Sequence, residues 1–579
     1  MHLAFLEEIL QLDRAQMHKM NNATVEPAAV ESQSSKAIWA ISRRFAWPVT
    51  LVILSLCYYL LFFDRGVNFN DEGTLFMAAD GILHGKTLYR DLYVAYMPGS
   101  YYLYALFFKL FGASVRMGRF LGVLLRCGNT LAVYYLAREM VTPGFAVLPA
   151  VALTLLPGPW HKTLFVTLSL LDMLLIARYA ERHSISRLVL MGLATGLTLL
   201  YRYELGLVAI GAASIVLLLW VRSALRQEHK QVRNVLLREW VGQVGLYVIV
   251  LLLPVLVAII YFYRQGALQY VVLFDALRGN LAKQGTMPMA RNIFQPWVFR
   301  LGQLTRLLRY NALVVLYYFP VLVYACTTVV LLYRQLTRRG HVEDRALLTV
   351  LVFGVLVYGL VLLEPAIAHL LVSLPAAWVL GVYLVYRLGE RLWLLVGHHS
   401  WTKAMACVLV LSPVVLWFCL LMGQVLQRVD VYMAGSIAQC FRNPAKLDLP
   451  RAQIFVGDEA EASALTNLAS YIRARVPPGS FVLVVPAGGG TKRLLHFLTE
   501  TFPPYRQRAI LTGASAQELL QLQYDIVNST DAARTEYAIL SGSDQDIEKF
   551  PQGYLLHYVW STFEVECVFG DYQVLRRKN

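Results

Sequence analysis

Apolar runs recur along the chain up to about residue 426, and short polar or charged segments separate them. An untilted helix needs about 20 apolar residues to cross a membrane, and most of the runs approach this length. They cover residues 47–63, 118–136, 145–156, 164–179, 188–200, 207–221, 241–263, 312–333, 347–363, 370–386 and 404–426. The pattern predicts a polytopic α-helical membrane protein with about eleven transmembrane helices, two of them short enough to be re-entrant.

The pattern changes after about residue 428, where short apolar runs alternate with helical periodicity. Strands are predicted at 481–485, 509–511 and 537–540, and an edge strand at 572–575. Helices are predicted at 462–476, 492–501 and 516–527. Strands that alternate with helices indicate a parallel sheet. The chain thus divides into a cytoplasmic tail (1–45), a transmembrane domain (46–427, with a first outer loop at 64–117) and a C-terminal soluble α/β domain (428–579).

Composition and charge support this division. The chain is 57% hydrophobic and 15% charged, with a net charge of +15. Residues 428–579 contain 15 Lys and Arg against 16 Asp and Glu, so the basic excess belongs to the membrane part. Basic residues of short loops mark the cytoplasmic side of a membrane protein, so nucleic-acid binding is the wrong interpretation. Alternate loops carry such residues: Arg43, Arg138, Arg182, Arg226, Arg338 and Arg391 are examples.

The same rule places the remaining polar turns on the outer side, together with the C-terminal domain. These turns surround Asp71, Trp160, Arg202 and His369, and the long segment 265–309 is expected on the same side. That segment is expected to be a flexible loop with an interfacial helix, and it would gate a binding cavity. Outer cations such as Arg90 either anchor the chain at lipid headgroups or line a site for an anionic ligand.

The cysteines show no metal-binding spacing. Cys440 and Cys567 lie in the domain predicted to be outside, where one disulfide between them is an open alternative. Residues 488–492 (Gly-Gly-Gly-Thr-Lys) lack the spacing of a nucleotide-binding loop.

Asp71 and Glu72 stand side by side just after the first apolar run. Carboxylates at the mouth of a membrane span are costly to hold near hydrocarbon, which suggests that they have a function. As a general base, Asp71 is the first candidate, and Glu72 is the alternative. Alternatively, the pair stabilises the N-terminus of the amphipathic helix that follows, in which Phe76, Ala79 and Leu83 share a face.

The segment 68–138 resembles the opening module of the GT-C superfamily of membrane glycosyltransferases. Its bacterial branch related to protein O-mannosyltransferases and lipid A aminoarabinose transferases is the most similar. The shared features are the acidic pair, the amphipathic helix, the motifs 85–91 (Gly-Lys-Thr-Leu-Tyr-Arg-Asp) and 98–102 (Pro-Gly-Ser-Tyr-Tyr), and Arg119 at the start of the second span. The turn at 201–206 and the segment 364–375 resemble later outer-side motifs of the family, and the whole resemblance covers about residues 45–390.

This resemblance implies an enzyme of the bacterial inner membrane that inverts the anomeric centre. It would transfer a sugar from a polyprenyl phosphate to a hydroxyl of a lipid, glycan or protein on the outer face, with Asp71 and Glu72 as catalytic residues. Arg202 and His369 are expected at the donor phosphate, because a guanidinium matches phosphate oxygens. Arg90, His161, Lys162 and Glu204 are further candidates for substrate binding.

A non-catalytic alternative exists for both residues. Arg202 would pair with Glu204 or contact lipid headgroups, and His369 would simply lie at the membrane interface. The second outer loop, 157–162, has no carboxylate. Metal-dependent relatives of the superfamily have one there, so we expect no metal or other cofactor.

Two other functions stay open at this stage. A transporter or flippase for lipid-linked or anionic substrates would show inverted repeats and helices broken at the midplane. The sequence has no internal repeat, and its polar residues gather at one side. A non-catalytic membrane scaffold has no need for an acidic pair, a guanidinium and an imidazole on one side.

Overall fold

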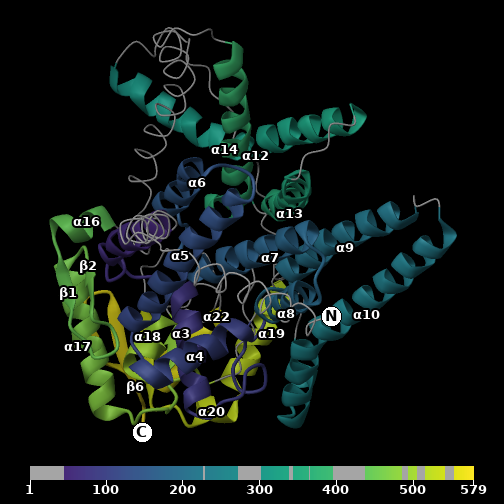
Figure 1. The fold of residues 1–579 in the computed structure, drawn as a ribbon. Coiled ribbons are helices and arrows are strands. Elements are labelled where there is room, and N and C mark those ends of the chain that lie inside the picture. The colour runs from purple at the N-terminus through teal and green to yellow at the C-terminus, as the bar shows by residue number, and fades with distance from the viewer. Residues whose placement is uncertain are drawn as a thin grey trace, which may run out of the picture.

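The computed structural model describes residues 45–94, 96–225, 229–271, 301–337, 343–363, 365–395, 437–485, 493–504, 516–541 and 553–579. The predicted N-terminal tail, the apolar run 404–426, Glu364 and the glycine-rich segment 488–492 lie outside these ranges. So does most of the predicted gating segment. Within the described residues, two parts meet: a bundle of apolar helices and a mixed domain of strands and helices (Figure 1).

The bundle is built from the apolar runs that the sequence shows. Within the described residues, seven helices are long and apolar enough to cross a membrane, and three shorter ones accompany them. The helices are Phe45–Leu60, α5 (Val115–Arg138), α6 (Pro143–Leu155), α7 (Thr163–Glu181), α8 (Ile185–Tyr201), α9 (Tyr203–Leu225), α10 (Lys230–Arg264), α12 (Leu301–Leu336), α13 (Asp344–Leu363) and α14 (Ile367–Leu395). The chain is a multi-pass membrane protein, and the count of about eleven spans stays a prediction.

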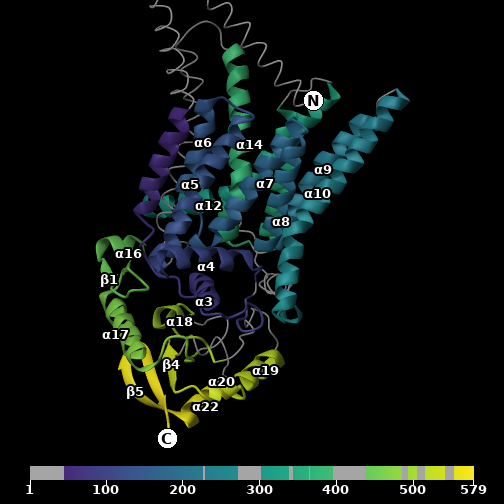
Figure 2. The same cartoon turned by 60° about the horizontal axis from the view of Figure 1, so that its bottom comes forward.

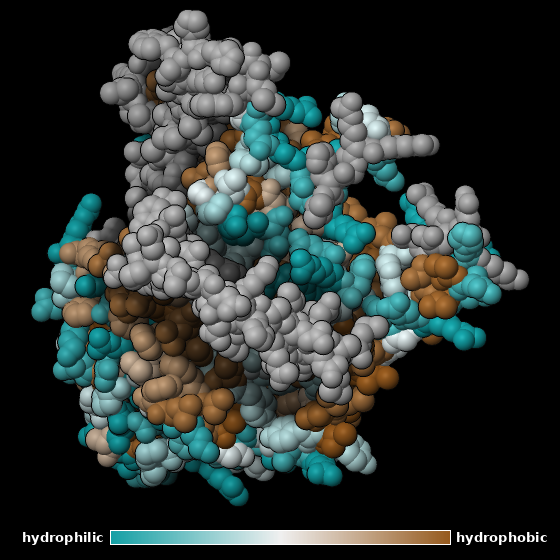
Figure 3. Space-filling view, viewed as in Figure 1, coloured by the Kyte–Doolittle hydropathy of each residue, from teal (hydrophilic) through white to brown (hydrophobic). Residues whose placement is uncertain are grey.

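Helices α9 and α10 lie at one side of the bundle, and the ends where they approach each other extend outward from it (Figures 1 and 2). Apolar side chains are exposed along α10, among them Ile249, Leu253 and Val257. The space-filling view shows hydrophobic side chains on the surface of this side of the molecule (Figure 3). A helix that is apolar on its exposed side fits a lipid environment, where such a side chain has no reason to be buried.

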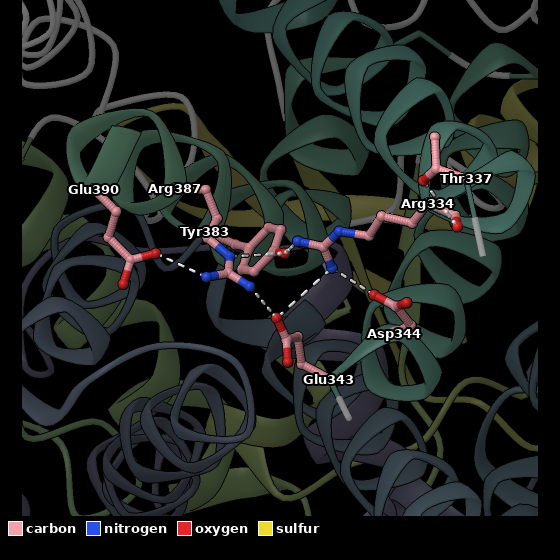
Figure 4. A network of polar contacts seen from close by, with 7 residues as sticks. All are labelled: Arg334, Thr337, Glu343, Asp344, Tyr383, Arg387 and Glu390. Atoms are coloured by element: carbon pink, nitrogen blue, oxygen red, sulfur yellow. Dashed lines mark hydrogen bonds and ion pairs between the residues drawn. The ribbon is translucent and has the colours of Figure 1, made fainter. Parts of the chain in front are cut away.

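One end of the bundle contains a network of ion pairs (Figure 4). Arg334 of α12 pairs with Glu343 and Asp344 at the start of α13. Arg387 of α14 pairs with Glu343 as well, and with Glu390 at 2.8 Å. Glu343 therefore joins two arginines from two helices. The network lies at the end of the bundle where the basic loops are found. The start of α14 lies at the opposite end.

Replacing Glu343 by Gln should lower the free energy of unfolding by about 2 kcal/mol, because two partly buried guanidinium groups lose a charged acceptor. Thermal unfolding in detergent measures this loss. Glu390→Gln is the control and should cost less, since Glu390 is more exposed and touches one arginine. Equal stability of the Glu343→Gln variant and the wild type would contradict the role given to this residue.

Two short helices of the first loop lie between the bundle and the C-terminal domain (Figure 2). They are α3 (Asp71–Leu83) and α4 (Gly99–Phe111). The expected amphipathic helix is α3, but it is not half-exposed: its residues are buried almost continuously from Glu72 to Gly81. The prediction was wrong on this point because the C-terminal domain covers the face that the sequence leaves polar. Asp80 on that face pairs with Arg451 at 2.8 Å.

Residues 437–579 combine a small sheet with surrounding helices. The strands β3 (Leu483–Val485), β4 (Tyr537–Ser541), β6 (Tyr572–Arg577) and β5 (Phe563–Phe569) are ordered β3-β4-β6-β5, and β1 (Ala445–Leu447) pairs with β2 (Ile454–Val456). The helices are α16 (Ile437–Arg442), α17 (Glu459–Arg475), α18 (Leu494–Thr499), α19 (Ala516–Val527), α20 (Thr530–Ala533) and α22 (Gly553–Thr562).

The predicted all-parallel sheet was wrong for the described strands: only β3 and β4 run parallel, and β6 pairs antiparallel with both β4 and β5. The expected edge strand 572–575 is β6, which lies inside the sheet. Gly570 and Asp571 form the tight connection between β5 and β6, and Gly570 has a positive φ of 55°. This Gly-Asp pair is typical of a hairpin and was the missed signal.

The two cysteines of the domain are separate thiols. Cys440 is buried and its Sγ lies 3.5 Å from the carbonyl oxygen of Phe455, whereas Cys567 lies on β5. The disulfide considered from the sequence is therefore not formed.

His496 of α18 makes the domain sensitive to acid. Burial, together with the charge of Arg493, lowers the pKa of His496 to about 3. Below about pH 6.5 the imidazole of His496 is protonated in the unfolded chain but stays neutral in the folded chain. The free energy of unfolding therefore falls as the pH drops. The loss should approach about 1.4 kcal/mol per pH unit between pH 6.5 and 3.

Thermal unfolding of wild type and His496→Gln at a series of pH values measures this contribution. The wild type should lose more stability than the variant as the pH falls from 7.5 to 5. Parallel pH profiles of the two proteins would contradict the assignment.

Candidate active site

Glu72 and Arg119 form a buried ion pair that joins the first loop to the bundle. Arg119 on α5 donates from Nε to Oε1 of Glu72 at 2.9 Å and from Nη2 to Oε2 at 2.7 Å. The two side chains are 1% and 3% exposed. Both carboxylate oxygens are therefore taken by one guanidinium, the bidentate geometry that charged groups prefer when they are removed from water.

Arg119 also forms hydrogen bonds to the backbone that precedes the acidic pair. Its Nη1 donates to the carbonyl oxygens of Phe63, Arg65 and Gly66, at 3.4, 2.8 and 3.1 Å. One side chain thereby fixes the chain that leaves the first helix and the helix α3 that follows it. These contacts give Arg119 a structural role.

Asp71 has the opposite environment. Its side chain is 58% exposed, and Oδ2 lies 3.5 Å from Nε2 of His161. Its backbone N–H donates to Oδ1 of Asn68 at 2.9 Å. Asp71 and Glu72 do occupy the first turn of α3, as the helix-terminus alternative expects, but the N-cap residue Asn70 makes no side-chain capping bond. The free carboxylate of the pair is therefore Asp71.

The second loop brings His161 to Asp71. It contains η1 (Trp160–Lys162), and Arg126 of α5 holds it. Arg126 is 2% exposed, and its Nη2 donates to the carbonyl oxygen of Gly158 at 2.8 Å. Its guanidinium lies 3.6 Å from the ring centre of Trp160.

Sequence reasoning missed Arg126. The signal was present, because a charged residue inside a predicted span is a functional candidate by default. Arg126 also follows Arg119 by two helical turns, on the same side of α5.

Arg202 lies at the C-terminal end of α8, where the chain turns into α9. Its Nε is 3.5 Å from Oε2 of Glu204, and its guanidinium lies 4.6 Å from the ring centre of Tyr96 and 5.5 Å from that of Phe165. At 3.5 Å the pair with Glu204 is a loose contact, longer than a charged hydrogen bond normally is. Glu204 thus accompanies Arg202, which is the non-catalytic alternative considered from the sequence.

His161 connects these groups. Its ring lies within electrostatic range of Asp71, Lys162, Glu72 and Arg202. The first loop, the second loop and the α8–α9 turn therefore converge around one imidazole. A carboxylate and a guanidinium from segments 131 residues apart both act electrostatically on this ring.

His369 lies in the first turn of α14, at the same end of the bundle. A side chain at Gly158 of the second loop would meet Val372, one turn further along α14, at 3.2 Å. The start of α14 thus adjoins the second loop, and the contact of His369 with a phosphate stays a prediction.

Arg90 is engaged in a link between the first loop and the end of α10. Its Nε and Nη2 donate to Asp91 at 2.8 and 2.9 Å, and its Nη1 donates to the carbonyl oxygen of Gln265 at 2.9 Å. The hydrogen bond from Arg90 lowers the pKa of Asp91. These contacts give Arg90 a structural task, and they leave its predicted role in substrate binding without support.

Breaking the Glu72–Arg119 pair should be strongly destabilising. Glu72→Gln or Arg119→Met leaves a buried charge without its partner, which costs about 3–5 kcal/mol. The double variant Glu72→Leu with Arg119→Met removes both charges and should be less destabilised than either single variant. Thermal unfolding of the three variants in detergent tests this, and a double variant as unstable as the sum of the singles would contradict it.

Comparison with known proteins agrees with this picture. Residues 96–261 match the family described as dolichyl-phosphate-mannose-protein mannosyltransferase. No curated protein sequence matched the chain.

Three solved structures are similar to this chain. ArnT from Cupriavidus metallidurans bound to undecaprenyl phosphate has a TM-score of 0.52 at 13% identity, over 92% of this chain and 98% of that one. The apo state of the same ArnT has a TM-score of 0.50 at 15% identity, with the same coverage. The archaeal oligosaccharyltransferase AglB from Archaeoglobus fulgidus, in complex with an inhibitory peptide and a dolichol-phosphate, has a TM-score of 0.49 at 11% identity, over 93% and 75%.

At these identities the ArnT structures show a shared fold. The resemblance to GT-C enzymes predicted from the sequence is thereby confirmed at the level of the fold. The chain is thus similar to the dolichyl-phosphate-mannose-protein mannosyltransferase family over residues 96–261, and it shares its fold with ArnT.

Proposed function

We propose that the protein transfers a sugar from a polyprenyl phosphate to a hydroxyl acceptor, with inversion at the anomeric carbon. The observation that carries the proposal is that an exposed carboxylate, Asp71, lies 3.5 Å from His161, and that the guanidinium of Arg202 acts electrostatically on the same imidazole. The relation to ArnT, whose structure contains undecaprenyl phosphate, supports a lipid phosphate as the leaving group.

In this reaction the acceptor oxygen attacks the anomeric carbon from the face opposite the phosphate. The bond between that carbon and the phosphate oxygen breaks, and the polyprenyl phosphate leaves with the electron pair. Asp71 takes the proton of the acceptor hydroxyl. Glu72 is not available for this step, because Arg119 binds both of its oxygens in a buried site. We therefore assign Glu72 a positioning role.

The leaving phosphate needs a cation as negative charge develops on its oxygen. Arg202 can supply it, because its contact with Glu204 is loose and its side chain is 20% exposed. His161 would orient Asp71 through Nε2, and Lys162 adds positive charge beside it. His369 is the second residue we propose at the phosphate. We propose a metal-independent reaction, since the second loop has His161 and Lys162 but no carboxylate.

The distribution of basic residues supports an outer location for this site, as the sequence predicts. The ion-pair network around Glu343 and the basic loops lie at the opposite end of the bundle. We propose that the site and the C-terminal domain face the periplasm or the cell exterior, and that the N-terminus lies in the cytoplasm.

The Asp71→Asn variant should lower kcat by about 100- to 10,000-fold, the usual contribution of a general base. Purified wild type and variant are given radiolabelled polyprenyl-phosphate sugars with membrane extract as acceptor, and binding of undecaprenyl phosphate is measured in parallel. Binding should be unchanged, because Asp71 does not contact the phosphate in this mechanism. Asp448→Asn is the matched control, since Asp448 is an exposed carboxylate of the C-terminal domain.

Equal transfer by wild type and Asp71→Asn would overturn the assignment of the base. Absence of transfer from every donor, together with accumulation of the lipid-linked sugar in the opposite leaflet of vesicles, would favour a flippase instead.

A further inference from the structure

The C-terminal domain touches the active site at the turn that carries Asp71. The backbone N–H of Leu494, in α18, donates to the carbonyl oxygen of Phe69 at 3.0 Å. Nη1 of Arg493, the residue before α18, donates to Oγ1 of Thr74 at 2.9 Å. Phe69 and Thr74 bracket Asp71 in the sequence, two residues before it and three after it.

Gly73 makes this approach possible. A Cβ atom at Gly73 would lie 2.4 Å from the backbone nitrogen of Leu494 and 2.9 Å from its Cα. These are backbone atoms, so no rotation of a side chain can relieve the clash. The first turn of α3 and the start of α18 therefore fit together only with glycine at this position.

The same contact extends along the whole of α3. The ring centre of Phe497 in α18 lies 5.7 Å from that of Phe76 in α3 and 5.7 Å from that of Phe108 in α4. At the far end of α3, Arg451 pairs with Asp80 at 2.8 Å and with Glu500 at 3.3 Å. The buried residues of the first loop and of the C-terminal domain form one continuous apolar cluster.

The first turn of α3 is thus held from two sides. Arg119 of the bundle binds Glu72 on one side, and Arg493 and Leu494 bind Thr74 and Phe69 on the other. Asp71 has an exposed side chain but a backbone fixed by both contacts. We propose that the C-terminal domain is a working part of the active site: Arg493 is a positioning residue that sets the place of Asp71 through Thr74.

This inference rests on the proposed function for its effect on catalysis, but its structural part can be tested without any substrate. Hydrogen–deuterium exchange of the backbone amides of α3 is measured on the full-length protein in detergent. Gly73→Ala and Arg493→Ala should each increase exchange in the first turn of α3 by about tenfold or more, since that turn loses its outer support. Arg534→Ala, the removal of an exposed arginine from the same domain, should leave exchange unchanged.

The catalytic part is tested with the transfer assay used for Asp71→Asn. Arg493→Ala should lower kcat by about 100-fold, the effect of a small displacement of a catalytic group, with little change in the KM for the donor. Arg493→Lys should recover part of the activity, because its ammonium can still donate to Thr74. In the Asp71→Asn background, Arg493→Ala should cause no further decrease.

Unchanged exchange in both Gly73→Ala and Arg493→Ala would overturn the inference. So would faster exchange with an unaltered kcat, or a further 100-fold loss when Arg493→Ala is added to Asp71→Asn. Full activity of Asp71→Asn would instead contradict the proposed function, while the exchange experiment would still decide whether the domain fixes α3.

Discussion

The site depends on the buried ion pair between Glu72 and Arg119. Two charges removed from water are stable only when they satisfy each other's hydrogen bonds, so this pair fixes the relative position of α3 and α5 narrowly. Arg119 extends that constraint to the backbone at Arg65 and Gly66. Because Glu72 cannot move, its neighbour Asp71 is carried on a fixed turn and is directed toward His161. Two adjacent carboxylates thereby acquire different tasks from their surroundings alone.

The remaining parts of the site are held in place by contacts with the helices of the bundle. Arg126 fixes the second loop through Gly158 and Trp160, and this places His161. The turn after α8 places Arg202. In each case a rigid helix of the bundle supports a short connecting segment whose side chains are available for chemistry. The C-terminal domain completes the arrangement from the other side, because α18 packs on α3 without any intervening side chain at Gly73.

The sequence predicted the parts of this architecture that depend on local pattern. Apolar runs located the helices, and the acidic pair with Arg119 and Arg202 marked the candidate site. The burial of α3 could not be predicted, because periodicity shows which face is apolar but not what covers the other face. The division of labour between Asp71 and Glu72 was also undecided, since it depends on Arg119, 47 residues further along the chain. In the C-terminal domain, helix periodicity was visible, but strand order depends on pairing between segments that lie far apart.

In the proposed reaction, Asp71 and Arg202 belong to one site, and the donor phosphate binds at Arg202. A structure of the protein in lipid nanodiscs with bound undecaprenyl phosphate tests this most directly. The phosphate oxygens should lie within about 3 Å of the Arg202 guanidinium. A phosphate bound elsewhere, with Arg202 still against Glu204 and Tyr96, would contradict it.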